Sequence, residues 1–190
     1  MARFQLRLST VLLIATLVVW GCRADKPRTA SEAITLMTGY DEQQNYDKAI
    51  RTGEDWQKNH PEDTSHQGAV YEQLAIHYLM KAARDFKHKE DWIRSAVAYY
   101  DKDLSFNRRA IVDIRFFTAG HGFASAGDLS STDSCLYYGR AVKAFEQEAA
   151  LVQGNNATVD GKTFSLAPLR QENEKALEEV KSKFAKSGCK

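Results

Sequence analysis

The strongest constraint on the fold is a pattern of large and small residues that recurs 45 positions along the chain. Residues 71–78 read YEQLAIHY and residues 116–123 read FFTAGHGF, so aromatic residues and smaller ones occupy matching places. Residues 96–100 (AVAYY) and 141–145 (AVKAF) match at the same offset. A constant offset over two separated blocks indicates an internal repeat. Three prolines and eleven glycines in 190 residues also suit a helical chain better than a turn-rich β fold.

Residues 33–61 carry a first copy of the pattern. The positions that define the repeat are occupied there by Ala33, Leu36, Tyr40, Tyr46, Ala49 and Pro61. The three copies together resemble the tetratricopeptide repeat (TPR), a helical hairpin with small residues at close helix crossings. Units two and three carry nine extra residues between their helices, near 84–92 and 128–136. The resemblance implies an all-α fold: a superhelical array of three TPR-like hairpins over residues 31–153, with units two and three extended. The alternative is an unrelated helical bundle with accidental periodicity.

The pattern predicts helices near residues 31–42, 45–59, 67–85, 91–106, 110–126, 135–152 and 167–186. Residues 154–166 contain an Asp160-Gly161 turn, so this stretch is expected to be a loop or a small hairpin. Residues 167–190 form the last segment, in which Leu169, Ala176, Leu177 and Val180 fall on one helical face. Repeat arrays need a terminal cap with one polar face, and this helix is expected to supply it.

The first residues of the chain have the pattern of a targeting segment. Residues 1–21 begin with a short basic stretch and continue with a ten-residue apolar run, the right length for a signal peptide. The run ends Val19-Trp20-Gly21-Cys22, which resembles the bacterial lipobox. The resemblance implies that residues 1–21 are a lipoprotein signal peptide, that Cys22 is lipidated and that residues 22–30 are a tether. The alternative is an ordinary signal peptide cut near Gly21 or Ala24.

This resemblance places the protein in a bacterial cell envelope. Arg23 follows the lipid cysteine, where an aspartate would be associated with retention in the inner membrane. In a Gram-negative organism we therefore expect the outer membrane, with the domain facing the periplasm. Beyond the inner membrane the environment is oxidising, so Cys135 and Cys189 can pair. Such a disulfide would join the cap to the last repeat across 54 residues, and two free thiols are the alternative.

Several kinds of function receive no support from the residues. The chain has 26 Lys and Arg against 25 Asp and Glu, which argues against a nucleic-acid partner. It contains no H-E-x-x-H, C-x-x-C or G-x-S-x-G motif and no glycine-rich phosphate loop. We therefore expect no catalytic residues, no metal and no cofactor, and expect that the protein is not an enzyme.

The TPR resemblance implies a concave groove lined by the first helix of each hairpin. Mapping the pattern onto this chain gives nine groove residues: Ile34, Thr38, Asp41, Glu72, Ile76, Leu79, Phe117, His121 and Ala124. Their apolar members suit an amphipathic helix or an extended segment of a partner. The alternatives are that the chain's own terminus covers this face or that these residues pack between helices.

The function expected on these grounds is a membrane-tethered TPR scaffold that binds another cell-envelope protein, in envelope assembly, piloting or regulation. The rival expectation is an accessory component of a solute transport system, or a small-ligand-binding lipoprotein.

Overall fold

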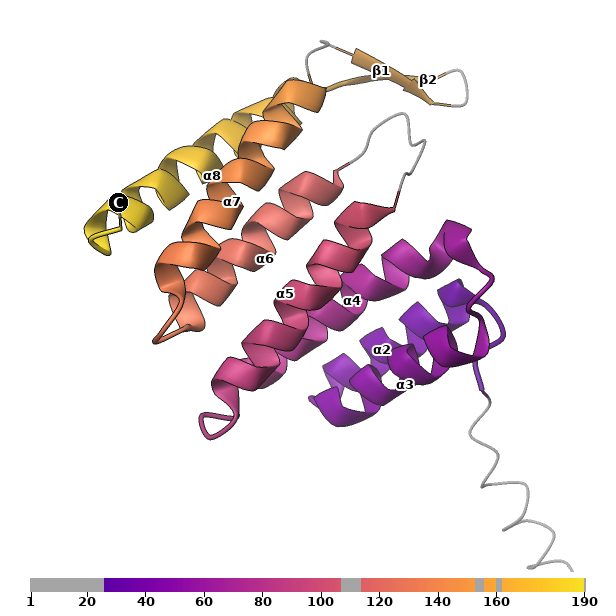
Figure 1. Ribbon diagram of the computed structural model, residues 1–190. Coiled ribbons are helices and arrows are strands. Elements are labelled where there is room, and N and C mark those ends of the chain that lie inside the picture. The colour runs from indigo at the N-terminus through magenta and orange to yellow at the C-terminus, as the bar shows by residue number, and fades with distance from the viewer. Residues whose placement is uncertain (1–25, 107–113, 153–155, 160–161, 190) are drawn as a thin grey trace, which may run out of the picture.

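The computed structural model describes residues 26–106, 114–152, 156–159 and 162–189. Seven helices and one two-stranded hairpin make up this part of the chain (Figure 1). They are α2 (Ala30–Glu42), α3 (Tyr46–Asn59), α4 (Thr64–Ala82), α5 (Lys89–Ser105), α6 (Arg115–Leu129), α7 (Ser134–Leu151), β1 (Asn156–Val159), β2 (Lys162–Ser165) and α8 (Ala167–Lys186). The mostly helical fold is confirmed, and the small hairpin lies where the sequence allowed one.

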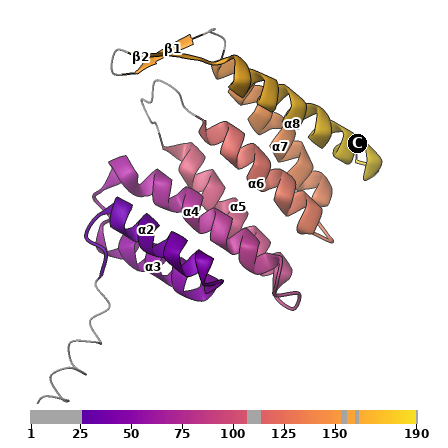
Figure 2. The same ribbon diagram turned by 180° about the vertical axis from the view of Figure 1, so that it is seen from behind.

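The helices pack in sequential pairs. Each helix contacts the next along the chain, which gives the hairpins α2–α3, α4–α5 and α6–α7, with α8 against α7 (Figures 1 and 2). In addition, α2 contacts α4, α4 contacts α6, and α6 contacts α8. Within the described ranges, few or no contacts join α3 to α5 or α5 to α7. The first helices of the pairs therefore form an inner layer in which neighbours touch, and the second helices form an outer layer.

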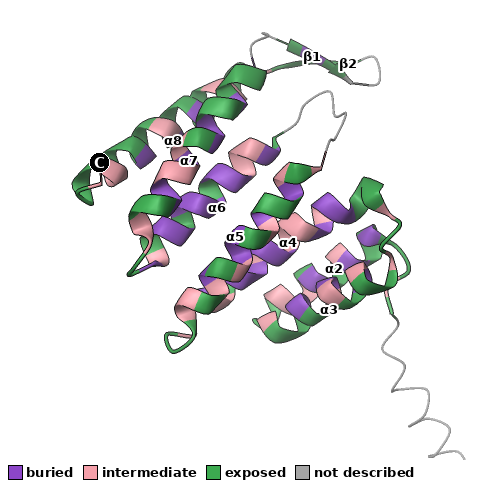
Figure 3. Cartoon of the chain, viewed as in Figure 1, coloured by how far each residue is buried: buried purple, intermediate pink, exposed green. Residues whose placement is uncertain are grey.

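Burial follows the 45-residue offset. At equivalent positions of the second and third pairs, both residues are buried. These positions are Leu74 and Ala119, Ala75 and Gly120, Ala96 and Ala141, and Tyr100 and Phe145. Figure 3 shows the buried residues on the faces where helices meet. The repeat in the sequence is thus a repeat in packing.

The extra residues of units two and three mostly lengthen helices, which refines the expectation of inserted segments between them. The loops inside the three hairpins span residues 43–45, 83–88 and 130–133. Only three of the nine extra residues in unit two, and one in unit three, therefore belong to the loop. In the loop 83–88, Asp85 accepts hydrogen bonds from Trp92 Nε1 at 3.0 Å and from His88 Nδ1 at 3.2 Å. The bond from Trp92 is the main reason that the pKa of Asp85 falls to about 2.

The junction between the second and third pairs is tightly packed at Gly122 on α6. A Cβ atom at this position would lie 2.1 Å from Cε2 and 2.3 Å from Cζ of Tyr100 on α5. Tyr100 is buried, at 2% exposure, so its ring fills the space that a side chain at Gly122 would need. The equivalent residue in α4, 45 positions earlier, is the buried His77.

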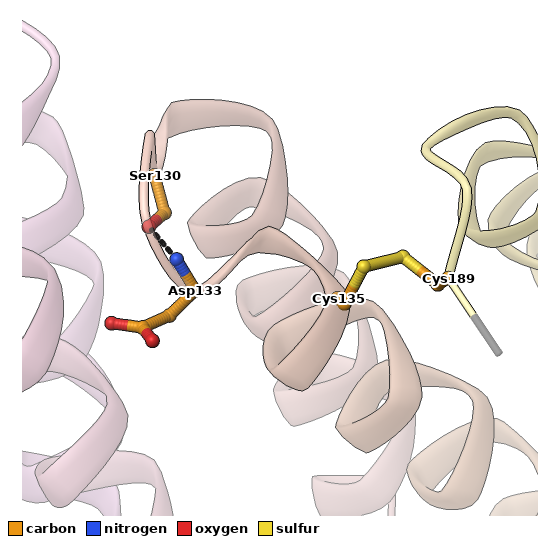
Figure 4. Close-up of a disulfide and its surroundings, with 4 residues drawn as sticks. All are labelled: Ser130, Asp133, Cys135 and Cys189. Carbon is orange, nitrogen blue, oxygen red and sulfur yellow. Dashed lines mark hydrogen bonds between the residues drawn. A yellow bond between two sulfur atoms is a disulfide. The ribbon is translucent and has the colours of Figure 1, made fainter.

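Helix α8 closes the array as a cap. The buried Asn173 Nδ2 donates a 2.9 Å hydrogen bond to the Phe145 carbonyl of α7. Lys183 Nζ reaches Asp128 of α6 at 2.8 Å. At the far end of α8 a disulfide joins Cys135 to Cys189, with their Cα atoms 5.4 Å apart (Figure 4). The expected cystine is confirmed, and it fixes the end of the cap to the first turn of α7.

Beside this disulfide, a serine side chain stabilises the loop before α7. Ser130 Oγ accepts a 3.0 Å hydrogen bond from the Asp133 backbone N–H (Figure 4). Glu90 at the start of α5 accepts hydrogen bonds from Ser130 Oγ at 2.9 Å and from the Ser131 backbone N–H at 2.8 Å. These bonds join the loops of the second and third pairs at one end of the molecule.

The chain is fixed to the molecule before α2 begins. Thr29 Oγ1 caps the helix by accepting the Glu32 backbone N–H at 3.1 Å, and the Arg28 backbone N–H donates to Glu32 Oε2 at 2.8 Å. The expected signal peptide and Cys22 lie outside the described residues. In the part of the chain that is described, no helix combines the length and apolar character needed to cross a bilayer.

Candidate functional site

The nine residues predicted to line a groove lie on the inner-layer helices α2, α4 and α6, three on each. Leu79 and Ala124 belong to the hydrophobic core, each at 8% exposure, so they hold helices together and offer little surface. Thr38 and His121 are exposed. The other five are half-buried, namely Ile34, Asp41, Glu72, Ile76 and Phe117. The inner layer therefore presents seven of the nine residues, in whole or in part, to solvent.

An aromatic cluster stands at the third unit of this face. The ring of His121 lies edge-on to Phe117, with 4.6 Å between centroids, and 5.1 Å from Phe145. Partial burial against these rings lowers the pKa of His121, while Glu179 and Glu172 on α8 act in the opposite direction. The acidic side chains of the cap thus border the imidazole. One alternative was that the chain's own C-terminal segment covers the face, and α8 does border it at this unit.

A second aromatic cluster was not expected from the sequence. Rings of α4 and α5 follow one another at centroid distances of 5.5–5.8 Å, in the order Phe106, Tyr71, Tyr99, Tyr78 and Trp92. Lys102 Nζ lies 4.6 Å from the centroid of Tyr99, and Lys81 Nζ lies 3.8 Å from that of Trp92. Such cation–π contacts stabilise exposed sites by about 0.5–1 kcal/mol each.

Glu54 ties this cluster to the first unit. From α3, its carboxylate accepts hydrogen bonds from Tyr78 Oη at 2.6 Å and Tyr99 Oη at 3.2 Å. Burial, followed by the bond and charge of Glu54, raises the pKa of Tyr78. Burial and the charge of Glu54 likewise raise the pKa of Tyr99. Both hydroxyls therefore stay protonated as donors, and the arrangement joins unit one to unit two.

A wide cleft lies along the first pair of helices. It has a volume of about 1330 Å³ and runs between α2, α3 and the segment that precedes them. Its lining includes Arg28, Leu36, Tyr40, Asp55 and Trp56, and none of the nine predicted residues. The indole of Trp56 is 1% exposed, and its Nε1–H has no hydrogen-bond partner among the described residues. The sequence offered no signal for this cleft, because it forms where two helices and the segment before them come together in space.

Among the residues that the structure describes, no group of three or more His, Cys, Asp or Glu side chains is placed to bind a metal ion. Comparison with protein-family models, with curated proteins and with solved structures gives no match to this chain.

Proposed function

We propose that this chain is a membrane-tethered helical scaffold of the TPR type that binds another protein of the cell envelope. The observation that carries the proposal is the inner layer, in which α2, α4 and α6 touch in sequence. This is the arrangement expected of stacked hairpins whose first helices line a common face. A solenoid uses such a face to bind extended segments or helices.

The chemistry of the face suits an amphipathic partner. Ile34, Ile76 and Phe117 supply half-buried apolar surface from three successive helices. Thr38 and Asp41 supply polar groups at the first unit. A partner helix can bury its apolar stripe on the first set and keep hydrogen bonds with the second. Burying apolar area contributes roughly 25 cal/mol per Å², so a modest contact gives useful affinity when a lipid confines both proteins to one surface.

The proposed location in the cell follows from two independent features. The Cys135–Cys189 disulfide indicates an oxidising, extracytoplasmic location. The proposed lipid on Cys22 then anchors the domain to a bacterial membrane, and Arg23 favours the outer one, facing the periplasm. Two acyl chains or more give stable attachment, since each buried methylene contributes about 0.8 kcal/mol.

Photo-crosslinking in intact cells tests the partner. We would place the crosslinking residue at Thr38 or His121 on the inner layer, and at Arg51 or Lys143 on α3 and α7 as matched exposed controls. We expect one discrete protein adduct from the inner-layer positions and little from the controls. Equal adducts from all four positions, or none from Thr38 and His121, would refute the proposed face.

A paired substitution adds a quantitative readout. Ile76→Ala with Phe117→Ala removes apolar surface from two inner-layer helices, and we expect weaker capture of the crosslinked partner. Circular dichroism would verify that the variant remains folded, because both residues also pack against the core. Unchanged capture by a folded variant would contradict the proposal.

The cleft on the first pair favours a second candidate function, a lipoprotein that binds a small ligand or assists a solute transporter. Its volume of about 1330 Å³ is large enough for a metabolite. Native mass spectrometry of the purified protein tests this candidate. A co-purifying small molecule that is lost on Trp56→Phe would support it, and a ligand-free protein would count against it.

A further inference from the structure

We propose that the hairpin β1–β2 is a second membrane contact, which docks on the bilayer that holds the lipid anchor. The inference rests on the proposed lipidation of Cys22 and adds to it a surface and an orientation. It commits to a lipid surface as the occupant of the hairpin's exposed apolar side.

The order of the helices places the hairpin at the tethered end. Because consecutive helices run back and forth, α2, α4, α6 and α8 all begin at the same end of the molecule. The hairpin joins the end of α7 to the start of α8, so it lies at that end too. Figures 1 and 2 show the hairpin and the segment before α2 on the same side of the stack, at its two extremes.

The tether leaves little freedom at this end. Arg28 and Thr29 are fixed by hydrogen bonds with Glu32, and Lys26 lines the cleft against the first pair. Only four Cα spacings separate Lys26 from Cys22. At about 3.3–3.6 Å per residue, Lys26 then lies within roughly 14 Å of the lipidated cysteine. The end of the array that carries Lys26 therefore lies close to the membrane surface in the tethered protein.

The hairpin has the side chains for such a surface. The register pairs Phe164 with Ala157, and the alternation of strands puts Lys162 on the same face as Phe164. Ala157 is buried, at 7% exposure, so Phe164 and Lys162 supply the accessible surface that is described on this face. The opposite face carries only amide and hydroxyl groups: Asn156, Thr158, Thr163 and Ser165. Phe164 is 52% exposed, so about half of this residue is left open by the described part of the chain. A lone two-stranded hairpin is marginally stable in water, and a supporting surface would stabilise it.

An aromatic ring beside a lysine fits the headgroup region of a bilayer. The ring enters the boundary of the acyl chains while the long lysine side chain reaches the phosphates. Leu151 and Ile114 are also exposed at this end of α7 and α6, and can join the contact. Burying one Phe side chain favours the docked state by roughly tenfold to a hundredfold.

The opposite end of the molecule provides a matched control. Phe86, in the loop between α4 and α5, is 80% exposed. It is separated from the tethered end by the length of α4, about 28 Å for 19 residues at 1.5 Å each. A membrane contact at the tethered end leaves Phe86 in water.

The experiment uses the full lipidated protein, purified from the membrane fraction and reconstituted into vesicles of phosphatidylethanolamine and phosphatidylglycerol. Phe164→Trp and Phe86→Trp are compared with the parent, with and without brominated acyl chains that quench nearby indoles. We expect bromine-dependent loss of the added emission for Phe164→Trp, and none beyond the parent for Phe86→Trp. A further variant, Phe164→Trp with Lys162→Glu, should lose part of the quenching.

Four other results are informative. A mass without acyl chains overturns the proposed lipidation, and this inference falls with it. An acylated protein that floats with vesicles while Phe164→Trp matches the parent overturns only the inference. A blue-shifted but unquenched Phe164→Trp means that protein covers the hairpin, a second copy or a partner, and also overturns it. Equal quenching of both variants refutes the orientation.

Discussion

Replacing Gly122 with alanine tests how closely the second and third units are joined. The new Cβ would lie 2.1 Å from Cε2 of Tyr100, which is buried at 2% exposure. Overpacking of this kind costs about 1–3 kcal/mol. Alanine also gains roughly 0.5–1 kcal/mol over glycine inside a helix, which offsets part of the cost. We expect a net loss of about 1–2 kcal/mol, or roughly 2–8 °C in Tm for a chain of this size.

Thermal and urea unfolding, followed by circular dichroism, would measure the change. Gly39→Ala is the matched control, because Gly39 also lies inside a helix but a Cβ there meets nothing within 4 Å. The control should be stabilised by about 0.5–1 kcal/mol. Tyr100→Leu should relieve the crowding, so the double variant with Gly122→Ala should lose less than the sum of its parts. A Gly122→Ala protein at least as stable as the parent would refute the packing of α5 on α6.

Replacing Cys135 and Cys189 with alanine opens a loop of 54 residues, and we expect unfolding to be easier by about 4 kcal/mol in urea titration; an unchanged midpoint would mean that the cap holds without the disulfide. Asn173→Ala removes the buried donor to the Phe145 carbonyl and should cost about 1–3 kcal/mol, whereas the exposed neighbour Glu172→Ala should be neutral. The pKa of Asp85 is about 2 in the folded protein against 3.8 ordinarily, so its contribution to stability is present above pH 3.8 and is lost as the pH falls toward 2. The Tm difference between the parent and Asp85→Ala should therefore shrink over that range, and a constant difference would contradict this assignment.

Much of the helical framework could be predicted from residue spacing alone. Small or apolar residues at positions 74, 75, 96 and 100 recur 45 places later, and both members of each pair are buried. Spacing sets which side of a helix is apolar, and apolar sides must meet. The cystine could be anticipated because the lipobox resemblance implies a lipid on Cys22 and leaves two other cysteines.

Residue spacing could not predict how the extra residues are used. Whether nine residues become loop or helix depends on the length over which neighbouring helices remain in contact, which is a property of the packed pair. The fate of Leu79 and Ala124 depended on the same property. The repeat pattern placed them on an open face, but packing in the folded protein puts them in the core.

The clusters that the sequence did not reveal combine residues far apart in the chain. Glu54 meets Tyr78 and Tyr99, which are 24 and 45 positions away. A single acidic residue on a helix predicts only a solvated position. Its role appears when the next pair brings the hydroxyls of the buried Tyr78 and the half-buried Tyr99 against it, because a hydroxyl removed from water needs a partner. Such contacts belong to the junction between pairs, where this chain departs from regular repetition.

The two proposed contacts are compatible because they use different directions of the molecule. The helices run from the tethered end to the end that carries Phe86, so a membrane against the first end stands across the helix axes. The inner layer lies along those axes. Its exposed residue Thr38 lies within α2, and its exposed residue His121 lies within α6. Docking of the hairpin would therefore leave this face open. Docking would also hold the inner layer in a fixed orientation relative to the membrane. A partner confined to the same membrane would then lose less rotational freedom on binding. If the inner face binds a partner, removing Phe164 should then weaken capture at the membrane while leaving capture in detergent unchanged.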